Sequence, residues 1–443
     1  MARDAAGTRS VARGIKEDDM KRRTAFVAAV TGLVSALAIT GCSTGQSAGG
    51  DGSSMTFMTF ESPSLTATFW DKSIAQAQKS VPDTKVKKIV SPDADRNAYA
   101  KQLQAAGQFP DILSSINPKD FTDAGLLKPF DQKWLEDNFT DPNGNAIAGK
   151  TYIPPTNSQI IPMVFYNKKI FAENHLQVPT TWDQFMNVVK TLKSAGVTPL
   201  EMAGGDPMSS AMPLSGLITA DVLGSDPQWV QKRYKGQVKF TDPEMVAAVS
   251  KFRQLVDAGG FDKGALSVSY ADANTQFLAG KAGMYPMGSW LIGLITPEKA
   301  KDFGTFLLPS KTGNPVVPFI TGGTTSVNAK SANADDAATF ARAWSLSKPN
   351  LKSLIESDGA FPMLKNVTLK DFGAKVTPVY DQGYKLVTDK NNKVNAFAQA
   401  NNDDALPPGV VDQFCSLAQK LFTSSDTKGL LTAFDADWDK AAK

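Results

Sequence analysis

The chain has 443 residues, one histidine, two cysteines, and 47 basic against 44 acidic side chains. Seven of the basic and four of the acidic groups lie in residues 1–41, so the remaining 402 residues carry 40 of each and are neutral. A neutral chain gives no electrostatic argument for a nucleic-acid partner, which we therefore do not expect, and a single histidine excludes a multi-histidine metal site. Because this length exceeds what one hydrophobic core usually supports, we expect two lobes.

An export signal is the first feature along the chain. Lys21, Arg22 and Arg23 form a positive start, and residues 24–39 form an apolar run that is short and alanine-rich for a membrane span. Small residues then lead into Cys42 in a pattern that resembles a lipobox. We therefore expect cleavage before Cys42, a lipid on its thiol, and anchorage at the extracytoplasmic face of the cell membrane. A transmembrane anchor is the alternative, and no polar stop-transfer pattern supports it.

The first two segment boundaries follow from this signal. Residues 1–41 are expected to be a lipoprotein signal peptide, with Met20 as an alternative start because the 19 residues before it are polar and charged. Residues 42–53, which are rich in glycine and serine, are expected to form a lipidated flexible tether.

Two single residues limit the chemistry. Cys415 has no disulfide partner when Cys42 is lipidated, and apolar residues at helical spacing around it predict a buried structural thiol rather than a nucleophile. His175 ends a short helical pattern and is expected to be exposed to solvent. Hydrolysis by a serine or cysteine nucleophile would need this histidine as its base, so we expect no catalytic residues, and also no metal and no cofactor.

Strands and helices alternate after the tether. Strands are predicted over 55–60, 85–90 and 110–113, with helices over 66–80 and 97–106 between them. This order predicts a parallel sheet with right-handed crossovers, whose ligands lie beyond the carboxyl ends of the strands. Polar residues that follow the first and third strands are candidates for this rim, namely Glu61, Ser115 and Asn117.

A second α/β set occupies the middle of the chain. Residues 159–166 predict a strand, and Thr181 is expected to cap a helix that has Gln184 at its capping-box position. Apolar residues of this helix recur on one face, and Gly196 stops it. Further helices are predicted over 242–258, 272–278, 335–345 and 410–422.

Several motifs, in a fixed order, resemble the family 1 extracellular solute-binding proteins, the carbohydrate-binding lipoproteins of ABC importers that are related to maltose-binding protein. The central signature comprises residues 166–171, 179–185 and 192–200. Further matches are residues 108–112, residues 277–284 with Gly288-Ser289-Trp290, Gly322-Gly323 before Ser326-Val327-Asn328, and residues 359–362. The matches run from about residue 54 to the C-terminus, and their joint order and spacing carry the resemblance.

The resemblance implies an α/β fold with two lobes, a periplasmic-binding-protein-like clamshell whose discontinuous lobes are joined by a multi-crossing hinge. The hinge crossings are expected near 159–162, 307–311 and 359–362. The N-terminal lobe would then comprise 54–159 plus 308–358, and the C-terminal lobe 160–307 plus 359–443. A ligand that contacts both lobes only when they are closed shifts the equilibrium toward closure.

The resemblance also implies site residues. Trp290 matches a tryptophan that stacks on a sugar ring in relatives, with core packing as the alternative. Asp206 lies where relatives often place a carboxylate on sugar hydroxyls, although Asp-Pro is also ordinary turn chemistry. Asp111 matches the family's Pro-Asp, with a structural role as the alternative. Gly322 and Gly323 would let the backbone approach a ligand closely or make a hinge-side turn.

Two classes of function remain. The first is a tethered, monomeric receptor that binds a mono- or oligosaccharide and delivers it unchanged to the permease of an ABC transporter. The second is a secreted glycan-active hydrolase, which would need two carboxylates about 5–10 Å apart across one bond. The family resemblance and the lack of a recognisable catalytic motif favour the receptor.

Overall fold

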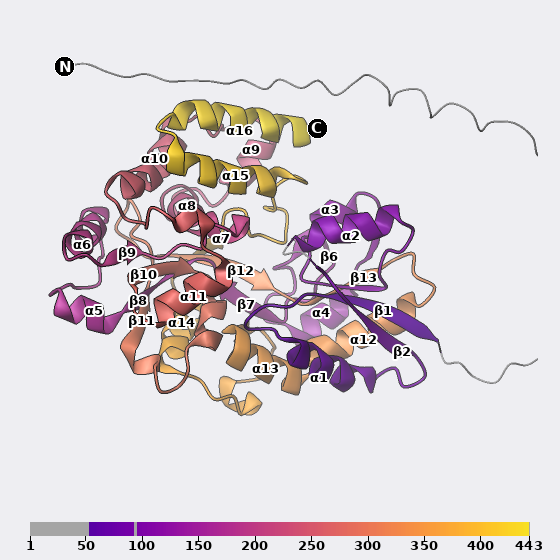
Figure 1. The fold of residues 1–443 in the computed structure, drawn as a ribbon. Coiled ribbons are helices and arrows are strands. Elements are labelled where there is room, and N and C mark those ends of the chain that lie inside the picture. Colours follow the sequence, from indigo (N-terminus) through magenta and orange to yellow (C-terminus); the bar gives the residue numbers. More distant parts are fainter. Residues whose placement is uncertain (1–52, 93–94, 443) are drawn as a thin grey trace, which may run out of the picture. The chain divides into compact units, whose positions relative to one another are not determined.

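The structure is a computed structural model that describes residues 53–92 and 95–442 (Figure 1). The predicted signal peptide, Cys42 and residues 42–52 of the predicted tether lie outside the described residues. Within the described part, the fold is mixed α/β with one five-stranded sheet, two four-stranded sheets and a two-stranded hairpin. None of the helices described here is both long enough and apolar enough to cross a membrane.

The first sheet contains the alternating strands predicted near the start of the chain. Its order is β2-β1-β3-β13-β4, in which β1 pairs in parallel with β2 and β3. The predicted parallel arrangement of these three strands is therefore confirmed. Strand β13 enters from far along the chain and lies antiparallel between β3 and β4. The strands are β1 (Ser54–Thr59), β2 (Lys85–Val90), β3 (Ile112–Ser114), β4 (Leu127–Lys128) and β13 (Thr325–Asn328).

Helices and a hairpin complete this first lobe, by which we mean the first sheet and the elements packed on it. They are α1 (Ala67–Gln78), α2 (Arg96–Ala105), α3 (Lys119–Thr122), α4 (Gln132–Asn138), α12 (Ala334–Leu346), and the hairpin of β5 (Ala146–Ile147) and β6 (Lys150–Thr151). Helix α1 begins where the Thr66 side chain accepts a hydrogen bond from the Phe69 N–H, and its apolar face buries Phe69, Trp70 and Ile74. The core of the lobe is aromatic, because Phe57 meets Trp344 edge to face at 5.4 Å between ring centroids.

The second sheet has the order β11-β8-β10-β9 and forms the second lobe with the helices packed on it. Its strands are β8 (Met163–Asn167), β9 (Thr198–Leu200), β10 (Ala282–Met287) and β11 (Phe303–Phe306). Its helical elements are α5 (Lys168–Glu173), α6 (Trp182–Ser194), α7 (Pro207–Ser210), α8 (Met212–Ile218), η1 (Thr219–Leu223), α9 (Trp229–Tyr234), α10 (Pro243–Asp257), η2 (Ala265–Ser267), α11 (Tyr270–Leu278), η3 (Ser289–Leu294), η4 (Ala300–Asp302), α15 (Val410–Thr423) and α16 (Thr427–Ala441).

The helix predicted after Thr181 is confirmed together with its cap. The Thr181 hydroxyl accepts a hydrogen bond from the Gln184 N–H at 3.3 Å, and the Gln184 side chain accepts one from the Thr181 N–H at 3.3 Å. The predicted apolar face of α6 is buried, from Phe185 to Leu192. Local sequence signals and packing therefore agree in this helix.

The third sheet joins the lobes and has the order β14-β7-β12-β15. In Figure 1 its strands β7 and β12 lie between the elements of the two other sheets. The strands are β7 (Asn157–Ile160), β12 (Val316–Gly322), β14 (Phe361–Pro362) and β15 (Asn392–Asn395), and the helical elements nearby in sequence are α13 (Lys348–Asp358), η5 (Leu369–Phe372) and α14 (Pro378–Thr388).

The prediction of one strand over residues 159–166 is wrong. The chain forms two strands there, β7 of the third sheet and β8 of the second, separated at Ile161 and Pro162. Proline has no N–H to donate to a strand ladder, so the ladder breaks at this position. The break lets one continuous segment leave the third sheet and enter the second.

Three hydrophobic clusters are present among the described residues, and the two largest hold the body together. One runs continuously from Phe57 in the first sheet through Ile355 of α13 to Leu291 of η3 and Tyr285 of β10. The other joins the second sheet to α8, α10, α15 and α16 and contains Cys415, whose side chain is 3% exposed. Burial raises the pKa of the Cys415 thiol to about 12, so the prediction of a buried structural thiol is confirmed. His175 is exposed, as predicted.

Candidate functional site

Trp290 is held where η3 meets the end of α13. Gly293 lies against the backbone of the last turn of α13, and Gly359, with a φ of +53°, lies against the first carbonyl of η3. A Cβ at either position would collide with these backbone atoms, so only glycine permits the approach. The two close contacts bring the η3 residue Trp290 to the end of α13, where Asp358 is the last residue.

Two further side chains of the second lobe lie beside Trp290. The phenol of Tyr270, the first residue of α11, lies next to the side chains of Asn274 and Trp290. Burial raises the pKa of Tyr270 to about 12, the Asn274 side chain opposes the rise, and the charges of Asp358 and Asp206 add to it. Aromatic faces, an amide and two carboxylates therefore converge in one region.

Several buried polar atoms in this region have no hydrogen-bond partner among the described residues. They are both amide atoms of Asn274, which is 3% exposed, and the hydroxyls of Tyr285 and Ser289, whose residues are fully buried. Leaving such an atom unpaired costs about 1–3 kcal/mol, so folded proteins usually supply a partner. Buried water would satisfy these atoms.

Arg96 is the cation of the site and comes from the first lobe. Its guanidinium carbon lies 4.3 Å from the centroid of the Phe60 ring, and its Nε donates to the Ser115 carbonyl at 2.9 Å. None of the described residues accepts a hydrogen bond from its two terminal nitrogens. Burial lowers the pKa of Arg96, while nearby carboxylates, among them Asp358 and Asp206, raise it. The guanidinium of Arg96 therefore lies close enough to Asp358, at the end of α13, and to Asp206 of the second lobe to be affected by their charges.

Asp358 connects this region to the third sheet. The Gln159 side chain, in β7, donates to Asp358 Oδ2 at 3.0 Å and to the Asp358 carbonyl at 3.2 Å. Burial raises the pKa of Asp358 to about 7, against the hydrogen bond from Gln159 and the charge of Arg96, which both lower it. The carboxyl group is therefore linked to a hinge strand on one side and to the first lobe on the other.

Asp206 begins helix α7. Its Oδ1 accepts a hydrogen bond from the Ser209 N–H at 2.7 Å, as an N-cap residue does. Among the described residues no donor reaches its Oδ2. One oxygen of Asp206 therefore positions the side chain, and the other is available to a ligand hydroxyl.

The structure brings together three of the residues predicted for the site. Trp290 and Asp206 both affect the pKa of Tyr270. The Ser115 carbonyl accepts a hydrogen bond from Arg96. Glu61 is exposed and directly follows Phe60, on which Arg96 lies.

The other predicted residues make structural contacts. The Asn117 side chain accepts from the Lys119 N–H at 3.1 Å, at the start of α3. Asp111 lies at the amino end of β3, opposite the predicted rim, and accepts hydrogen bonds from Thr56 and Ser331. Gly322 and Gly323, at the end of β12, pack against the third sheet and the chain that leads into it, at residues 153–157.

Four residues that build the site were not predicted from the sequence: Arg96, Tyr270, Asn274 and Asp358. Arg96 follows the second strand of the first sheet, so the rule that ligands lie beyond strand ends could have found it. Asp358 directly precedes the predicted hinge crossing at 359–362. Tyr270 and Asn274 share a helix face at a spacing of four residues, which is common in any amphipathic helix and gave no signal.

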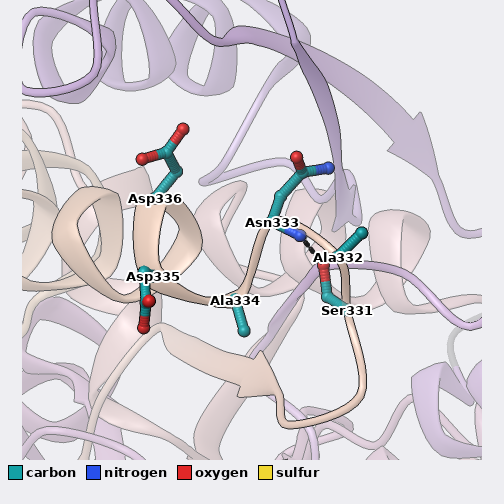
Figure 2. A pocket seen from close by; sticks show the side chains of 6 residues that line it. All are labelled: Ser331, Ala332, Asn333, Ala334, Asp335 and Asp336. Atoms are coloured by element: carbon teal, nitrogen blue, oxygen red, sulfur yellow. Dashed lines mark hydrogen bonds between the residues drawn. The ribbon is translucent and has the colours of Figure 1, made fainter.

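A surface depression of about 280 Å³ lies elsewhere, lined by Ser331, Ala332, Asn333, Ala334, Asp335 and Asp336 (Figure 2). Its walls are one loop and the first turn of α12, where the Asn333 N–H donates to the Ser331 hydroxyl. Ser331 also binds Asp111, and the Asn333 amide donates to the Ser54 carbonyl, so the depression lies at the amino ends of β1 and β3. Open-sheet ligands bind at the other end, and we assign the depression no function.

Glu201 directly follows β9 and is 6% exposed. One of its carboxylate oxygens accepts a hydrogen bond from the Met202 N–H at 3.2 Å. Burial raises the pKa of Glu201 to about 7, the Met202 N–H opposes the rise, and the charge of Asp262 adds to it. Ionised Glu201 is therefore disfavoured in the folded protein.

We expect the substitution Glu201→Gln to stabilise the protein above neutral pH. The folded-state pKa exceeds the unfolded value of about 4.3, so the unfolded chain loses its proton first and stability falls as the pH rises from about 4 to 7. The glutamine variant escapes this loss and should be more stable by roughly 1–3 kcal/mol at about pH 8, with no such gain near pH 4. Thermal melts over this pH range measure the difference.

The matched control is Glu173→Gln, which removes an exposed carboxylate of α5. The stability of Glu173→Gln should depend on pH in the same way as the stability of the parent protein. If Glu201→Gln also follows the parent at every pH, burial of Glu201 does not limit stability.

Aromatic faces, carboxylates and a guanidinium whose terminal nitrogens have no partner among the described residues lie in one region, to which both lobes contribute. The chain belongs to the bacterial extracellular solute-binding protein family, whose family model matches residues 62–350. The description of the family places its members outside the cytoplasm.

Individual relatives and solved structures agree with this assignment. The multiple sugar-binding protein of Streptococcus mutans serotype c is 25% identical over 306 residues, which cover 67% of this chain and 72% of the relative. A chitin oligosaccharide binding protein has a TM-score of 0.76 and 21% identity and covers 88% of this chain and 99% of its own. The bacterial solute receptor AcbH has a TM-score of 0.74 and 17% identity, and the match covers 88% of this chain and 100% of AcbH. These likenesses confirm the predicted two-lobed fold.

Proposed function

We propose that this protein is a membrane-tethered receptor that captures a mono- or oligosaccharide by closure of its lobes and delivers it unchanged to the permease of an ABC transporter. The observation that carries the proposal is the convergence of Trp290 and Tyr270 with Arg96, Asp206 and Asp358. Sugars present apolar ring faces and hydroxyl edges, which match aromatic rings and paired donors and acceptors.

Named relatives support the sugar as the ligand class. The relative from Streptococcus mutans is a multiple sugar-binding protein, AcbH is described with a preference for β-D-galactopyranose, and RafE was solved in complex with raffinose. These proteins differ in their sugars, and the identities are low. The proposal for this chain therefore extends to sugars as a class and to no single sugar.

Glycan hydrolysis is the second candidate, because two carboxyl groups lie in one region and burial raises the pKa of one, Asp358, to about 7. A general acid of a glycosidase has such a raised pKa. Both carboxyl groups already have structural contacts, which argues against hydrolysis. One oxygen of Asp206 caps helix α7, and one oxygen of Asp358 accepts a hydrogen bond from Gln159. The family is one of solute-binding proteins, which supports a receptor without enzymatic activity.

A sugar panel followed by product analysis tests the proposal. Galactose, raffinose, stachyose and chitin oligosaccharides are added to the full chain, and thermal shifts identify binders, because a ligand of the folded state raises its apparent stability. Calorimetric titration of each binder should give saturable binding, and chromatography should recover the sugar unchanged. Accumulation of cleaved products with repeated turnover would favour the hydrolase, and no binding by any polar solute would overturn the receptor.

The lobe boundaries are part of the proposal, at 54–159 plus 308–358 and at 160–307 plus 359–443. Two observations support them: β7 and β14 of the third sheet lie at or beside the proposed crossings, and α13 ends at Asp358. A monomeric receptor and a permease as its partner complete the proposal. In the described part of the chain, no group of three or more His, Cys, Asp and Glu side chains could hold a metal ion.

The lipid on Cys42 is also proposed, on the basis of the sequence pattern around it. We expect the parent protein, expressed in a bacterium, to sediment with membranes and to enter the detergent phase on phase separation. The substitution Cys42→Ser should move it to the aqueous phase, because no acyl chain can attach. Mass spectrometry of the amino terminus provides the direct readout, and an unmodified Cys42 in membrane-bound protein would contradict the prediction.

A further inference from the structure

A second set of contacts between the lobes involves none of the residues of the site described above. Lys119, the first residue of α3, places its Nζ 4.1 Å from the centroid of the Tyr234 ring at the end of α9. The same Nζ donates to the carbonyl oxygens of Asp403 at 3.4 Å and Ala405 at 3.3 Å. One side chain of the first lobe therefore reaches an aromatic ring and two carbonyls on the other side.

The segment that receives this cation is fixed to the second lobe. The Tyr234 hydroxyl donates to the Ala405 carbonyl at 2.6 Å. The Gln231 amide donates to the Asp403 carbonyl at 2.8 Å and to Asp404 Oδ1 at 2.9 Å. These bonds hold the carbonyls and the ring in place, so the cation meets a preorganised set of acceptors.

The β5–β6 hairpin of the first lobe contacts the same segment. The Ala148 N–H donates to Asp403 Oδ1 at 2.9 Å, and the Asp403 N–H donates to the Ala146 carbonyl at 3.2 Å. The Asn402 amide donates to the Gly144 carbonyl at 3.0 Å. Two separate parts of the first lobe, α3 and the hairpin, therefore bind residues 402–405.

We propose that Lys119 and residues 402–405 form a latch that holds the two lobes in the arrangement in which Arg96 of the first lobe lies near Asp206 of the second. The latch acts without touching the ligand. Burial lowers the pKa of Lys119, and the nearby charges of Asp403, Asp123 and Asp404 raise it, so the ammonium group is partly desolvated, the condition that strengthens a cation–π contact.

The latch has a defined consequence for binding. The fraction of empty protein that is already closed sets how much of the intrinsic affinity is realised. Loss of the latch lowers the closed fraction of the empty protein and so weakens the affinity for every sugar by the same factor. Loss of a residue that contacts the sugar instead changes the ranking of sugars. The inference rests on the proposed function for its effect on affinity, but the latch itself is a property of the empty protein.

The test measures the distance between the lobes in the absence of sugar. Spin labels are placed at Lys72→Cys on α1 and Lys190→Cys on α6, two exposed positions, in full chains that also carry Cys42→Ser. The buried Cys415 is left in place. The substitution Lys119→Met, which keeps the aliphatic stem but removes the charge, should shift the distance distribution away from the parent distribution.

Two variants act as controls for charge and for folding. Lys119→Arg retains a cation over the ring and should restore the parent distribution. Lys133→Met removes an exposed lysine that pairs with Asp137 within α4, at 2.9 Å, and should leave the distribution unchanged. Thermal melts show which variants are folded, and if Lys119→Met is not, Tyr234→Leu removes the ring from the opposite side of the contact.

Titration with the sugars that bind the parent provides the second readout. Lys119→Met should weaken all of them by the same factor, about 5- to 30-fold, without a change in their order. An unchanged distance distribution in folded Lys119→Met overturns the latch, whether or not any sugar binds. A change in the ranking of sugars also overturns it, because Lys119 would then contact the ligand. A parent protein that binds no sugar overturns the proposed function and leaves the distance measurement as the test of the latch.

Discussion

The substitution Arg96→Met is expected to weaken sugar binding by roughly 3–6 kcal/mol, the range for two charge-assisted hydrogen bonds. Arg96 is held by Phe60 and by the Ser115 carbonyl, and its two terminal nitrogens remain free of described partners. Methionine retains the packing on Phe60 but provides no donors. Calorimetry with the panel sugar that gives the largest thermal shift measures the loss.

The control for this substitution is Arg342→Met, on an exposed part of α12, where the arginine Nε donates to the Ala338 carbonyl of its own helix. That variant should bind like the parent. An affinity for Arg96→Met within a factor of two of the parent would show that the guanidinium serves the fold and not the ligand.

The substitution Trp290→Ala is expected to weaken binding by roughly 1–3 kcal/mol, because the ring provides an apolar face on which a sugar can stack. Trp290 is half-buried and lies beside Tyr270, so part of its surface is available to a ligand. Trp290→Phe should recover part of the loss, since a smaller ring still offers a face. Titration of both variants with the same sugar gives the comparison.

Trp182→Ala is the matched control. Trp182 stacks on Phe185 at 5.5 Å between ring centroids and begins α6, so its loss should lower the melting temperature and leave the affinity unchanged. If Trp290→Ala lowers the melting temperature in the same way and binds sugar like the parent, Trp290 belongs to the framework.

Local signals were sufficient to predict several elements of the fold. The capping box of Thr181 and Gln184, with an apolar face behind it, predicts α6, and the alternating segments near the start predict three parallel strands. The prediction of a single strand at 159–166 was wrong, because a pattern of apolar residues does not show that one strand ends before Pro162 and a strand of another sheet begins after it. Strand β13 could not be placed from its own sequence, since its partners β3 and β4 are distant along the chain.

The site was harder to predict than the fold. Trp290 and Asp206 were predicted through the family resemblance; Trp290 lies beside Tyr270, and the charge of Asp206 helps to raise the pKa of Tyr270. The pKa values of Asp358 and Arg96 are shifted by burial and by the charge of the other residue. Both effects depend on the packing of segments that are distant along the chain. A carboxylate at a helix end and an arginine after a strand are ordinary features in one dimension.

The position of β13 has a consequence for the order of synthesis. Residues 325–328 form an inner strand of the first sheet, so β3 and β4 lack their shared neighbour until nearly three quarters of the chain has been made. A nascent chain shorter than this exposes an unpaired strand edge and cannot complete its first domain. The first sheet therefore stays incomplete during most of the synthesis of the chain, and the first lobe cannot fold before the middle of the chain has been made.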